Sequence, residues 1–134
     1  MNLKNKKILI TGATGGIGYS LIKKFSELGC LILATGTNEE KLNKLRNEFK
    51  DIKITQFKLD EHLKIENFIE SCHKDLGGLD VVINNAGITI DNLAIRLADD
   101  NWKKVIDINL TSTFLICKYA IKKNVKKQIW KNYQ

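Results

Sequence analysis

Short apolar runs alternate along the chain with segments in which apolar residues recur every three or four positions. The runs at residues 7–11, 30–34 and 80–83 are continuous and strand-sized, as expected for strands that are covered on both faces. The run at residues 52–59 alternates apolar and polar positions, which favours a strand at the edge of a sheet. The pattern therefore predicts four strands, each followed by a helix.

Each helical segment places its apolar residues on one stripe, which should face the core. The expected inward-facing residues are Ile17, Leu21, Phe25 and Leu28 in the first helix, Leu42, Leu45 and Phe49 in the second, Ile65, Phe68, Ile69, Cys72 and Leu76 in the third, and Trp102, Val105, Ile106, Leu110, Phe114 and Cys117 in a long fourth helix. Gly29 and Gly77 are expected to end the first and third helices, and Asn38 to cap the start of the second.

This alternation of strands and helices with short links predicts an α/β domain with a parallel sheet and helices on both faces. Right-handed crossovers then give a doubly wound, Rossmann-type sheet of strand order 3-2-1-4. The 134 residues are enough for one domain. No apolar run approaches the length of a membrane span, so no membrane partner is expected.

A glycine-rich turn follows the first strand and reads Thr11-Gly12-Ala13-Thr14-Gly15-Gly16-Ile17-Gly18. A strand, such a turn and a helix N-terminus together present backbone N–H groups to a phosphate. Gly12 permits the tight turn, Gly16 lets the backbone approach a ligand, and Gly18 lets the helix pack on the sheet. We predict dinucleotide binding, with a purely structural turn as the alternative. No Gly-Lys-Ser/Thr follows, which excludes a P-loop.

Two further polar motifs lie in apolar surroundings. Asn84-Asn85-Ala86-Gly87 ends the fourth strand, beside the first strand, where ligands bind in doubly wound sheets. It either contacts a ligand or is an ordinary turn whose asparagines tie neighbouring strands. Asn109 stands between Ile108 and Leu110 in the fourth helix. It is either a satisfied core amide or a residue that bends the helix and holds a water near an active site.

In this order the three motifs resemble the short-chain dehydrogenase/reductase family, over residues 6–123. The segments similar to its bacterial 3-oxoacyl-[acyl-carrier-protein] reductase branch are Ile88-Thr89, Asp91-Asn92-Leu93, Arg96-Leu97, Trp102 and Asp107-Ile108-Asn109-Leu110. The resemblance implies hydride transfer from NADPH to the ketone of a 3-oxoacyl-[acyl-carrier-protein] in fatty-acid biosynthesis. It also implies a cytoplasmic enzyme that assembles as a homotetramer. Another short-chain alcohol or ketone dehydrogenase is the alternative within the family.

The resemblance assigns the site residue by residue. The pyrophosphate would be held by Gly12, Ala13, Thr14, Gly15, Gly16, Ile17 and Gly18. Thr37 would lie beside the adenine ribose, and Leu59 and Asp60 near the adenine. Asn85, Ala86 and Gly87 would approach the ribose and the nicotinamide. Asn109 would be the asparagine of the catalytic tetrad, which orders a proton-relay water.

The end of the second strand bears on the choice of cofactor. NAD-binding relatives have an acidic residue there, which accepts a hydrogen bond from the ribose 2′-OH. This chain has Gly36-Thr37 instead. This favours NADP(H) over NAD(H). The basic residue that NADP enzymes often carry before the second motif glycine is replaced by Gly15, and Lys41 is the candidate substitute. Lys58 stands where the family more often has Asp or Asn, so adenine recognition by that side chain is not expected.

The family's catalytic serine, tyrosine and lysine belong to a further strand and helix, beyond this chain's last residue. Tyr119 and Lys123 have the Tyr-x-x-x-Lys spacing, and Ser112 lies upstream, but all three share the helix of Asn109. We therefore do not assign them as catalytic, and we expect an inactive, marginally stable chain with an exposed apolar helix face. A non-catalytic dinucleotide-binding fragment is the alternative from a different functional class.

The net charge of +7 arises mostly after the last acidic residue, Asp107. The lysines beyond it are Lys118, Lys122, Lys123, Lys126, Lys127 and Lys131. A solvated lysine face or an abnormal tail explains them better than a nucleic-acid surface. We predict an incomplete dinucleotide-binding domain at residues 1–123 and an aberrant basic tail at residues 124–134. A frameshift near Asn124 would explain this tail. The nucleotide sequence there tests this, because a frameshift requires a reductase-like continuation in the shifted frame.

The cysteines and histidines carry no metal-site signal. Cys30, Cys72 and Cys117 are far apart in the sequence and share no ligand spacing with His62 or His73. We expect them to be reduced, mostly buried thiols in a cytosolic protein, and we predict no metal site.

Overall fold

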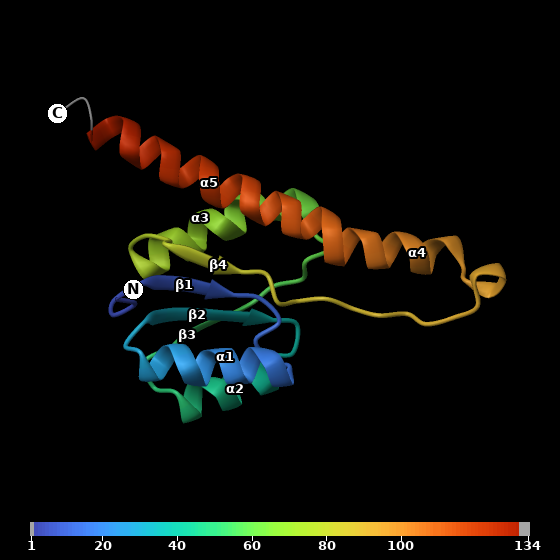
Figure 1. Ribbon diagram of the computed structural model, residues 1–134, viewed down its shortest axis with the longest axis horizontal. Coiled ribbons are helices and arrows are strands. Elements are labelled where there is room, and N and C mark those ends of the chain that lie inside the picture. The colour runs from blue at the N-terminus through green and yellow to red at the C-terminus, as the bar shows by residue number, and fades with distance from the viewer. Residues whose placement is uncertain (1, 132–134) are drawn as a thin grey trace.

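The computed structural model describes residues 2–131, and the side chains of residues 2–125 (Figure 1). Its four strands are β1 (Lys7–Ile10), β2 (Leu31–Gly36), β3 (Lys53–Gln56) and β4 (Val81–Ile83). They form one parallel sheet of order β3-β2-β1-β4, which confirms the predicted order. β3 lies at an edge, as its alternating pattern predicted.

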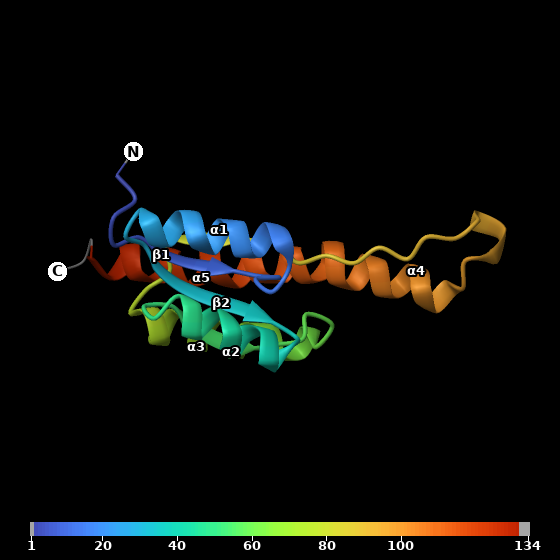
Figure 2. The same ribbon diagram turned by 90° about the horizontal axis from the view of Figure 1, so that it is seen from below.

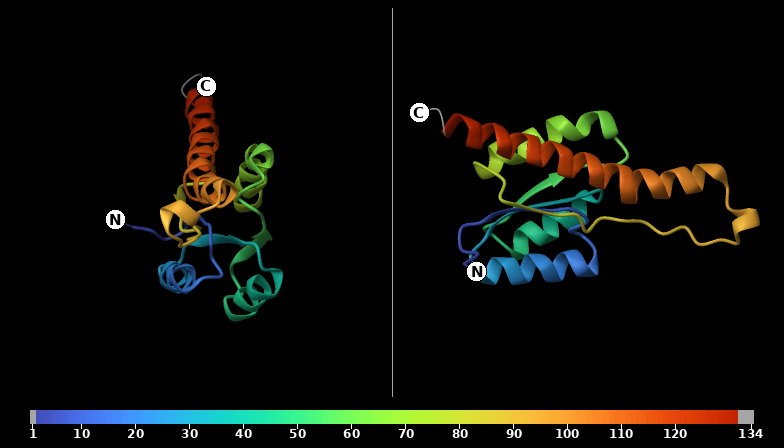
Figure 3. Two further views of the ribbon diagram at one scale, coloured as in Figure 1. Left: turned by 90° about the vertical axis from the view of Figure 1, so that its right-hand side faces the viewer. Right: turned by 45° about the horizontal axis from the view of Figure 1, so that its top comes forward.

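Helices cover both faces of the sheet. Their bounds are α1 (Gly16–Glu27), α2 (Glu39–Glu48), α3 (Ile65–Leu76), α4 (Asp99–Ile106) and α5 (Ser112–Lys131), with short turns η1 (His62–Lys64), η2 (Ala94–Arg96) and η3 (Asp107–Thr111). α1 and α2 pack on one face, and α3 and α5 on the other (Figures 1 and 3). The loop after β4 and helix α4 extend beyond the end of the sheet to which the strands point (Figures 1 and 2). Within the described residues, no helix has both the length and the apolar character that crossing a membrane requires.

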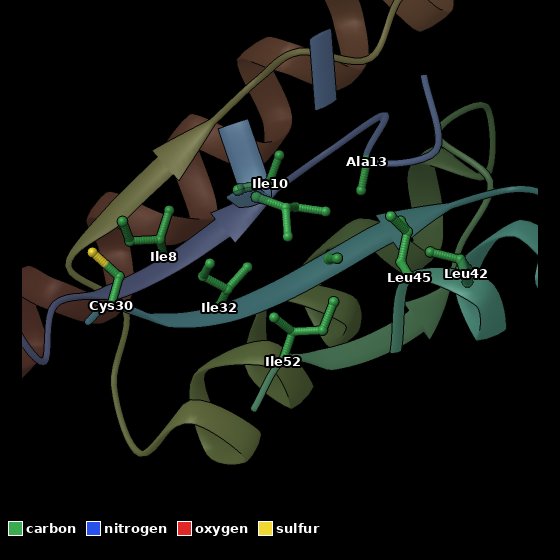
Figure 4. Packing of buried hydrophobic residues seen from close by; sticks show 10 residues of the cluster. Ile8, Ile10, Ala13, Cys30, Ile32, Leu42, Leu45 and Ile52 are labelled. Atoms are coloured by element: carbon green, nitrogen blue, oxygen red, sulfur yellow. The ribbon is translucent and has the colours of Figure 1, made fainter. Parts of the chain in front are cut away.

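Each face of the sheet has its own apolar core, because successive strand residues point to opposite faces. Ile8 and Ile10 of β1 pack with α1 and α2, among the residues drawn in Figure 4. Leu9, between them, packs on the other face with α3 and α5. All three are fully buried, as predicted for strands covered on both faces. β4 was also expected to be buried, but its residues are only half-buried, because in the described chain it pairs with β1 alone.

The helix ends follow the sequence signals. The Asn38 Oδ1 atom accepts from the Lys41 backbone N–H at 2.8 Å, which confirms the predicted cap of α2. Gly29 follows the end of α1, and Gly77 ends α3 in a left-handed conformation, both as predicted. Lys7 donates from Nζ to the Gly77 carbonyl, and Lys53 to the Asp75 carbonyl. These two cations stabilise the negative end of the α3 dipole.

The inward face of α1 matches the predicted stripe only in part: Leu21 and Phe25 pack against the core, but the two ends of the stripe do not. Gly18 and Ile22 are buried, whereas Ile17 is 72% exposed and Leu28 is 40% exposed. The reason is the close packing of Gly18 on the glycine turn, since a Cβ there would collide with the Gly12 carbonyl oxygen. This contact sets the rotation of the helix, so that Ile17 faces out of the core.

The predicted stripe of the long fourth helix is wrong at three of its six residues, whereas Val105, Ile106 and Cys117 are half-buried. Ser112, Ile116 and Ala120 face the core, whereas Trp102, Leu110 and Phe114 are each about 60% exposed. The apolar residues of α5 lie on several sides of the helix. Its main contact with the rest of the described chain is with α3. Ile116 and Ala120 make that contact, with Leu115 and Tyr119 partly buried beside them, whereas Phe114 and Ile121 are left exposed. The expectation of an exposed apolar helix face is thus confirmed.

Candidate functional site

A cavity of about 700 Å³ opens where the sheet's parallel strands end. Most of the residues that were predicted to bind a cofactor line it: Gly12, Thr14, Gly15, Gly16, Ile17, Thr37, Leu59, Asp60, Asn85, Ala86 and Gly87. Three predicted residues do not line it, namely Ala13, Gly18 and Asn109. The cavity thus coincides with the position that a doubly wound sheet uses for ligands.

The glycine turn forms one wall of the cavity, and three of its lining residues are glycines without side chains. Gly12 has a φ of +62°, and a Cβ on it would lie 2.7 Å from the Ala86 Cα atom. Only glycine fits such a turn. A Cβ on Gly16, by contrast, would meet no protein atom within 4 Å. Gly12 therefore packs the turn, and Gly16 faces open space.

The N-terminus of α1 is open toward the cavity. Gly15 is its N-cap and supplies no side-chain hydrogen bond, and no acidic residue stands in the first turn. The N-terminus of α2, by contrast, has its Asn38 cap and two glutamates in its first turn. The first N–H groups and the positive dipole end of α1 are consequently free for an anion.

Ala13 and Gly18 hold the turn in place. The Ala13 N–H donates to the Thr35 carbonyl at 3.0 Å, so that N–H is already used within the protein. Its side chain is fully buried in the core. Both residues thus shape the turn and do not line the cavity themselves.

Hydrogen bonds tie the asparagine motif to the glycine turn. The Asn85 side-chain amide donates to the Thr11 carbonyl at 3.1 Å and the Gly12 carbonyl at 3.0 Å. The Thr11 hydroxyl accepts from the backbone N–H of Asn85 and of Ala86, at 3.1 and 3.0 Å. Asn85 therefore ties two strand ends, as one of the two alternatives proposed, and it also lines the cavity. The part played by Thr11 was not predicted, since nothing in the sequence shows which backbone its hydroxyl meets.

Asn109 lies in η3, a π-helical turn between α4 and α5. Its Oδ1 atom accepts from the Ile88 N–H at 2.8 Å, and its Nδ2 atom donates to the Ile88 carbonyl at 2.9 Å. The amide is thus satisfied, but Asn109 is exposed and is not a core residue as the first alternative expected. The helix is distorted around it, as the second alternative expected. Its predicted role in ordering a water stays a prediction.

Charged residues line the cavity from two separate segments of the chain. Lys58 and Asp60 follow β3, and Lys104 belongs to α4, where it lies one turn before Ile108. Lys104 and Ile108 were not predicted, although their spacing of four residues places them on one helix face. Lys41, the candidate substitute for a basic motif residue, does not line the cavity.

Tyr119 and Lys123 belong to a second, smaller cleft between α3 and α5, of about 200 Å³. Lys123 pairs with Glu70, and Lys122 pairs with Glu66 at 2.7 Å. The hydrogen bond that Lys122 Nζ donates to the Glu66 carboxylate raises the pKa of Lys122 above its ordinary value. The two ion pairs join α5 to α3. Because neither Tyr119 nor Lys123 lines the larger cavity, the structure agrees with leaving them unassigned.

The sequence profile of the short chain dehydrogenase family matches residues 6–129. The chain belongs to this family. Among its relatives, the 3-oxoacyl-[acyl-carrier-protein] reductase FabG of Rickettsia felis is 43% identical over 124 residues, which are 92% of this chain and 50% of the relative. The protein of the same name from Escherichia coli is 31% identical over 129 residues, 96% of this chain and 53% of the relative. The chain spans about half the length of the curated relatives it matches.

Solved structures show the same fold. A short-chain dehydrogenase/reductase from Brucella melitensis superposes with a TM-score of 0.84 at 25% identity, over 91% of this chain and 53% of that one. A blue fluorescent protein from a metagenomic library, solved in complex with NADPH, superposes with a TM-score of 0.85 at 22% identity, over 91% of this chain and 52% of that one. These likenesses agree with the Rossmann-type sheet of order 3-2-1-4.

Proposed function

We propose that this chain binds NADP(H) in the cavity at the ends of its strands, and that it represents the cofactor-binding half of a 3-oxoacyl-[acyl-carrier-protein] reductase. The observation that carries the proposal is the uncapped N-terminus of α1, which opens with Gly15 and Gly16 into a cavity of about 700 Å³. The names of the similar reductases supply the substrate class. The related fold solved with NADPH supports the cofactor.

The residues present fit an adenine dinucleotide. The pyrophosphate would lie on the glycine turn, at the open N–H groups of α1. Thr37 would lie by the adenine ribose, and Leu59 and Asp60 by the adenine. Asn85, Ala86 and Gly87 would line the path toward the nicotinamide. The bound cofactor would supply the hydride, while these residues bind and orient it.

The preference for NADP(H) over NAD(H) rests on the end of β2. Gly36 and Thr37 line the cavity and bring no carboxylate to a ribose 2′ position. Lys58 is near this end, because Gln56 pairs with Gly36 in the sheet register and Gln56 Nε2 donates to the Thr37 carbonyl at 2.8 Å. Lys58 thus replaces Lys41 as the cation proposed for a 2′-phosphate.

The remaining properties are carried over from the relatives as part of the same proposal. They are action on a substrate linked to acyl-carrier protein, a homotetrameric assembly and a cytoplasmic location. The chain alone should bind cofactor without turnover, with residues 1–123 forming the incomplete dinucleotide-binding domain. α5 continues across Asn124, whose side-chain amide donates to the Leu79 carbonyl, and the side chains after residue 125 lie outside those described.

Titration of the purified chain with NADPH, followed by nucleotide fluorescence, tests the proposal. Saturable binding is expected, with no NADPH consumption when a 3-oxoacyl thioester is added. Gly16→Asp should abolish binding while the fold is kept, because the new carboxylate has room at this position and repels the pyrophosphate. Ser20→Asp, an equal charge on an exposed position of the same helix, is the control and should bind normally. A folded chain that does not bind NADPH would refute the proposal.

A further inference from the structure

The π-helical turn η3 is held by side chains from two parts of the chain. Its widened hydrogen bond runs from the Ser112 N–H to the Asp107 carbonyl, five residues earlier. Three successive carbonyls of the turn each accept one side-chain hydrogen bond: Asp107 from His62 Nε2 at 3.1 Å, Ile108 from Ser112 Oγ at 2.5 Å, and Asn109 from Thr113 Oγ1 at 3.0 Å. The turn is therefore a supported feature of the fold.

His62 differs from the other two donors, because it comes from a distant segment. Ser112 and Thr113 belong to α5, immediately after the turn, and bond back to its carbonyls. His62 begins η1, two residues after Asp60. Because a carbonyl oxygen only accepts, the imidazole donates from an Nε2–H.

The His62 bond joins two segments that line the cavity. Leu59 and Asp60 line it from the segment before η1, and Lys104 and Ile108 line it from α4 and η3. The Asp107 carbonyl precedes Ile108 directly, so a bond to it fixes the segment that carries this lining residue. η1 and η3 are separate in sequence, and this hydrogen bond spans 45 residues.

We propose that His62 is a positioning residue of the dinucleotide pocket. Its Nε2–H donates to the Asp107 carbonyl and holds the wall formed by Leu59 and Asp60 at a set distance from the wall formed by Lys104 and Ile108. The inference rests on the proposed cofactor function. His62 acts through the residues on either side of the bond and contacts no reacting atom.

Two substitutions at His62 separate the hydrogen bond from the bulk of the ring. His62→Ala removes the donor and should weaken NADPH binding about fivefold, the effect of one lost hydrogen bond. His62→Gln keeps an N–H donor at similar reach and should bind within about twofold of the wild type. Leu63→Ala, at an adjacent residue that is 99% exposed, is the control and should leave the affinity unchanged. Circular dichroism and the urea midpoint confirm that each variant is folded.

The outcomes are decisive in each case. Wild-type affinity in His62→Ala, or an equal loss in His62→Ala and His62→Gln, overturns the inference. If His62→Ala does not fold, a folded His62→Gln that loses affinity also overturns it. If the wild type itself does not bind NADPH, the proposed function fails, and amide hydrogen exchange of Ser112 in the ligand-free chain then tests the bond. Exchange should be faster in His62→Ala and close to wild type in His62→Gln, and unchanged exchange in His62→Ala overturns the inference.

Discussion

At the scale of single residues, the proposed preference for NADP(H) over NAD(H) depends on which cation lines the cavity, because the two cofactors differ by one phosphate. The sequence pointed to Lys41, but the structure puts Lys58 on the cavity wall and Lys41 outside it. Lys58 stands two residues after Gln56, which contacts the end of β2 through sheet pairing and a side-chain hydrogen bond. The exposed Lys58 is thus a cation on the cavity wall close in sequence to a residue that contacts Gly36 and Thr37.

Lys58→Gln should weaken NADPH binding about threefold and leave NADH binding nearly unchanged. The effect is small because Lys58 is exposed, and water and salt screen an exposed ion pair. Lys41→Gln provides the matched control and should change neither affinity. The dissociation constants of both nucleotides, measured at low and at physiological salt, check this. A loss with Lys41→Gln that exceeds the loss with Lys58→Gln would restore Lys41 as the phosphate ligand.

At the scale of elements, the sequence predicted the features that are determined by residues close to one another along the chain. The strand order, the Asn38 cap and the position of the glycine turn follow from local patterns, and the structure has all three. Contacts between distant segments were not predictable in this way. The hydrogen bond between the Thr11 hydroxyl and the Asn85 N–H, and the one between His62 and the Asp107 carbonyl, join segments that are far apart in the sequence. They form only because the fold brings these backbone groups close to the side chains.

The rotation of α5 was mispredicted for a related reason. Its apolar residues occur on several sides, so periodicity alone does not identify the side that meets α3. Phe114, Leu110 and Cys117 share one stripe, yet Phe114 is 62% exposed, whereas Ile116 is 1% exposed. Only the packing against α3 distinguishes them.

Two alanine substitutions on α5 test this orientation directly. Ile116→Ala should lower the free energy of unfolding by about 3 kcal/mol, because it leaves a cavity in the core around α3. Phe114→Ala should change it by less than about 0.5 kcal/mol, because the ring is largely in solvent. Urea unfolding at low protein concentration measures both. A larger loss with Phe114→Ala would favour the orientation that the sequence pattern predicted.

At the scale of the whole molecule, the described chain exposes apolar surface along one helical region. Trp102, Leu110, Phe114, Ile121 and Val125 are each between 47% and 62% exposed, on α4, η3 and α5. In the described chain β4 also pairs on one side only, and its residues are half-buried. Exposed apolar patches and open strand edges are the two features that most often drive association.

The chain should therefore associate as its concentration rises, and the extent should depend on the α5 face. The double variant Phe114→Ser with Ile121→Ser removes two apolar side chains that lie two helical turns apart on the same side, so it should shift association to higher concentration. Leu63→Ser removes a more exposed apolar residue on η1 and is the control, because an isolated exposed leucine makes no patch. Light scattering and sedimentation velocity follow the association, with NADPH titration to show that each variant keeps the pocket. Association that is unchanged in the double variant would show that the α5 face does not drive it, and would assign it to the open sheet edges at β4 and β3 or to the other exposed apolar residues. A wild type that stays monomeric over the whole concentration range would contradict the prediction altogether.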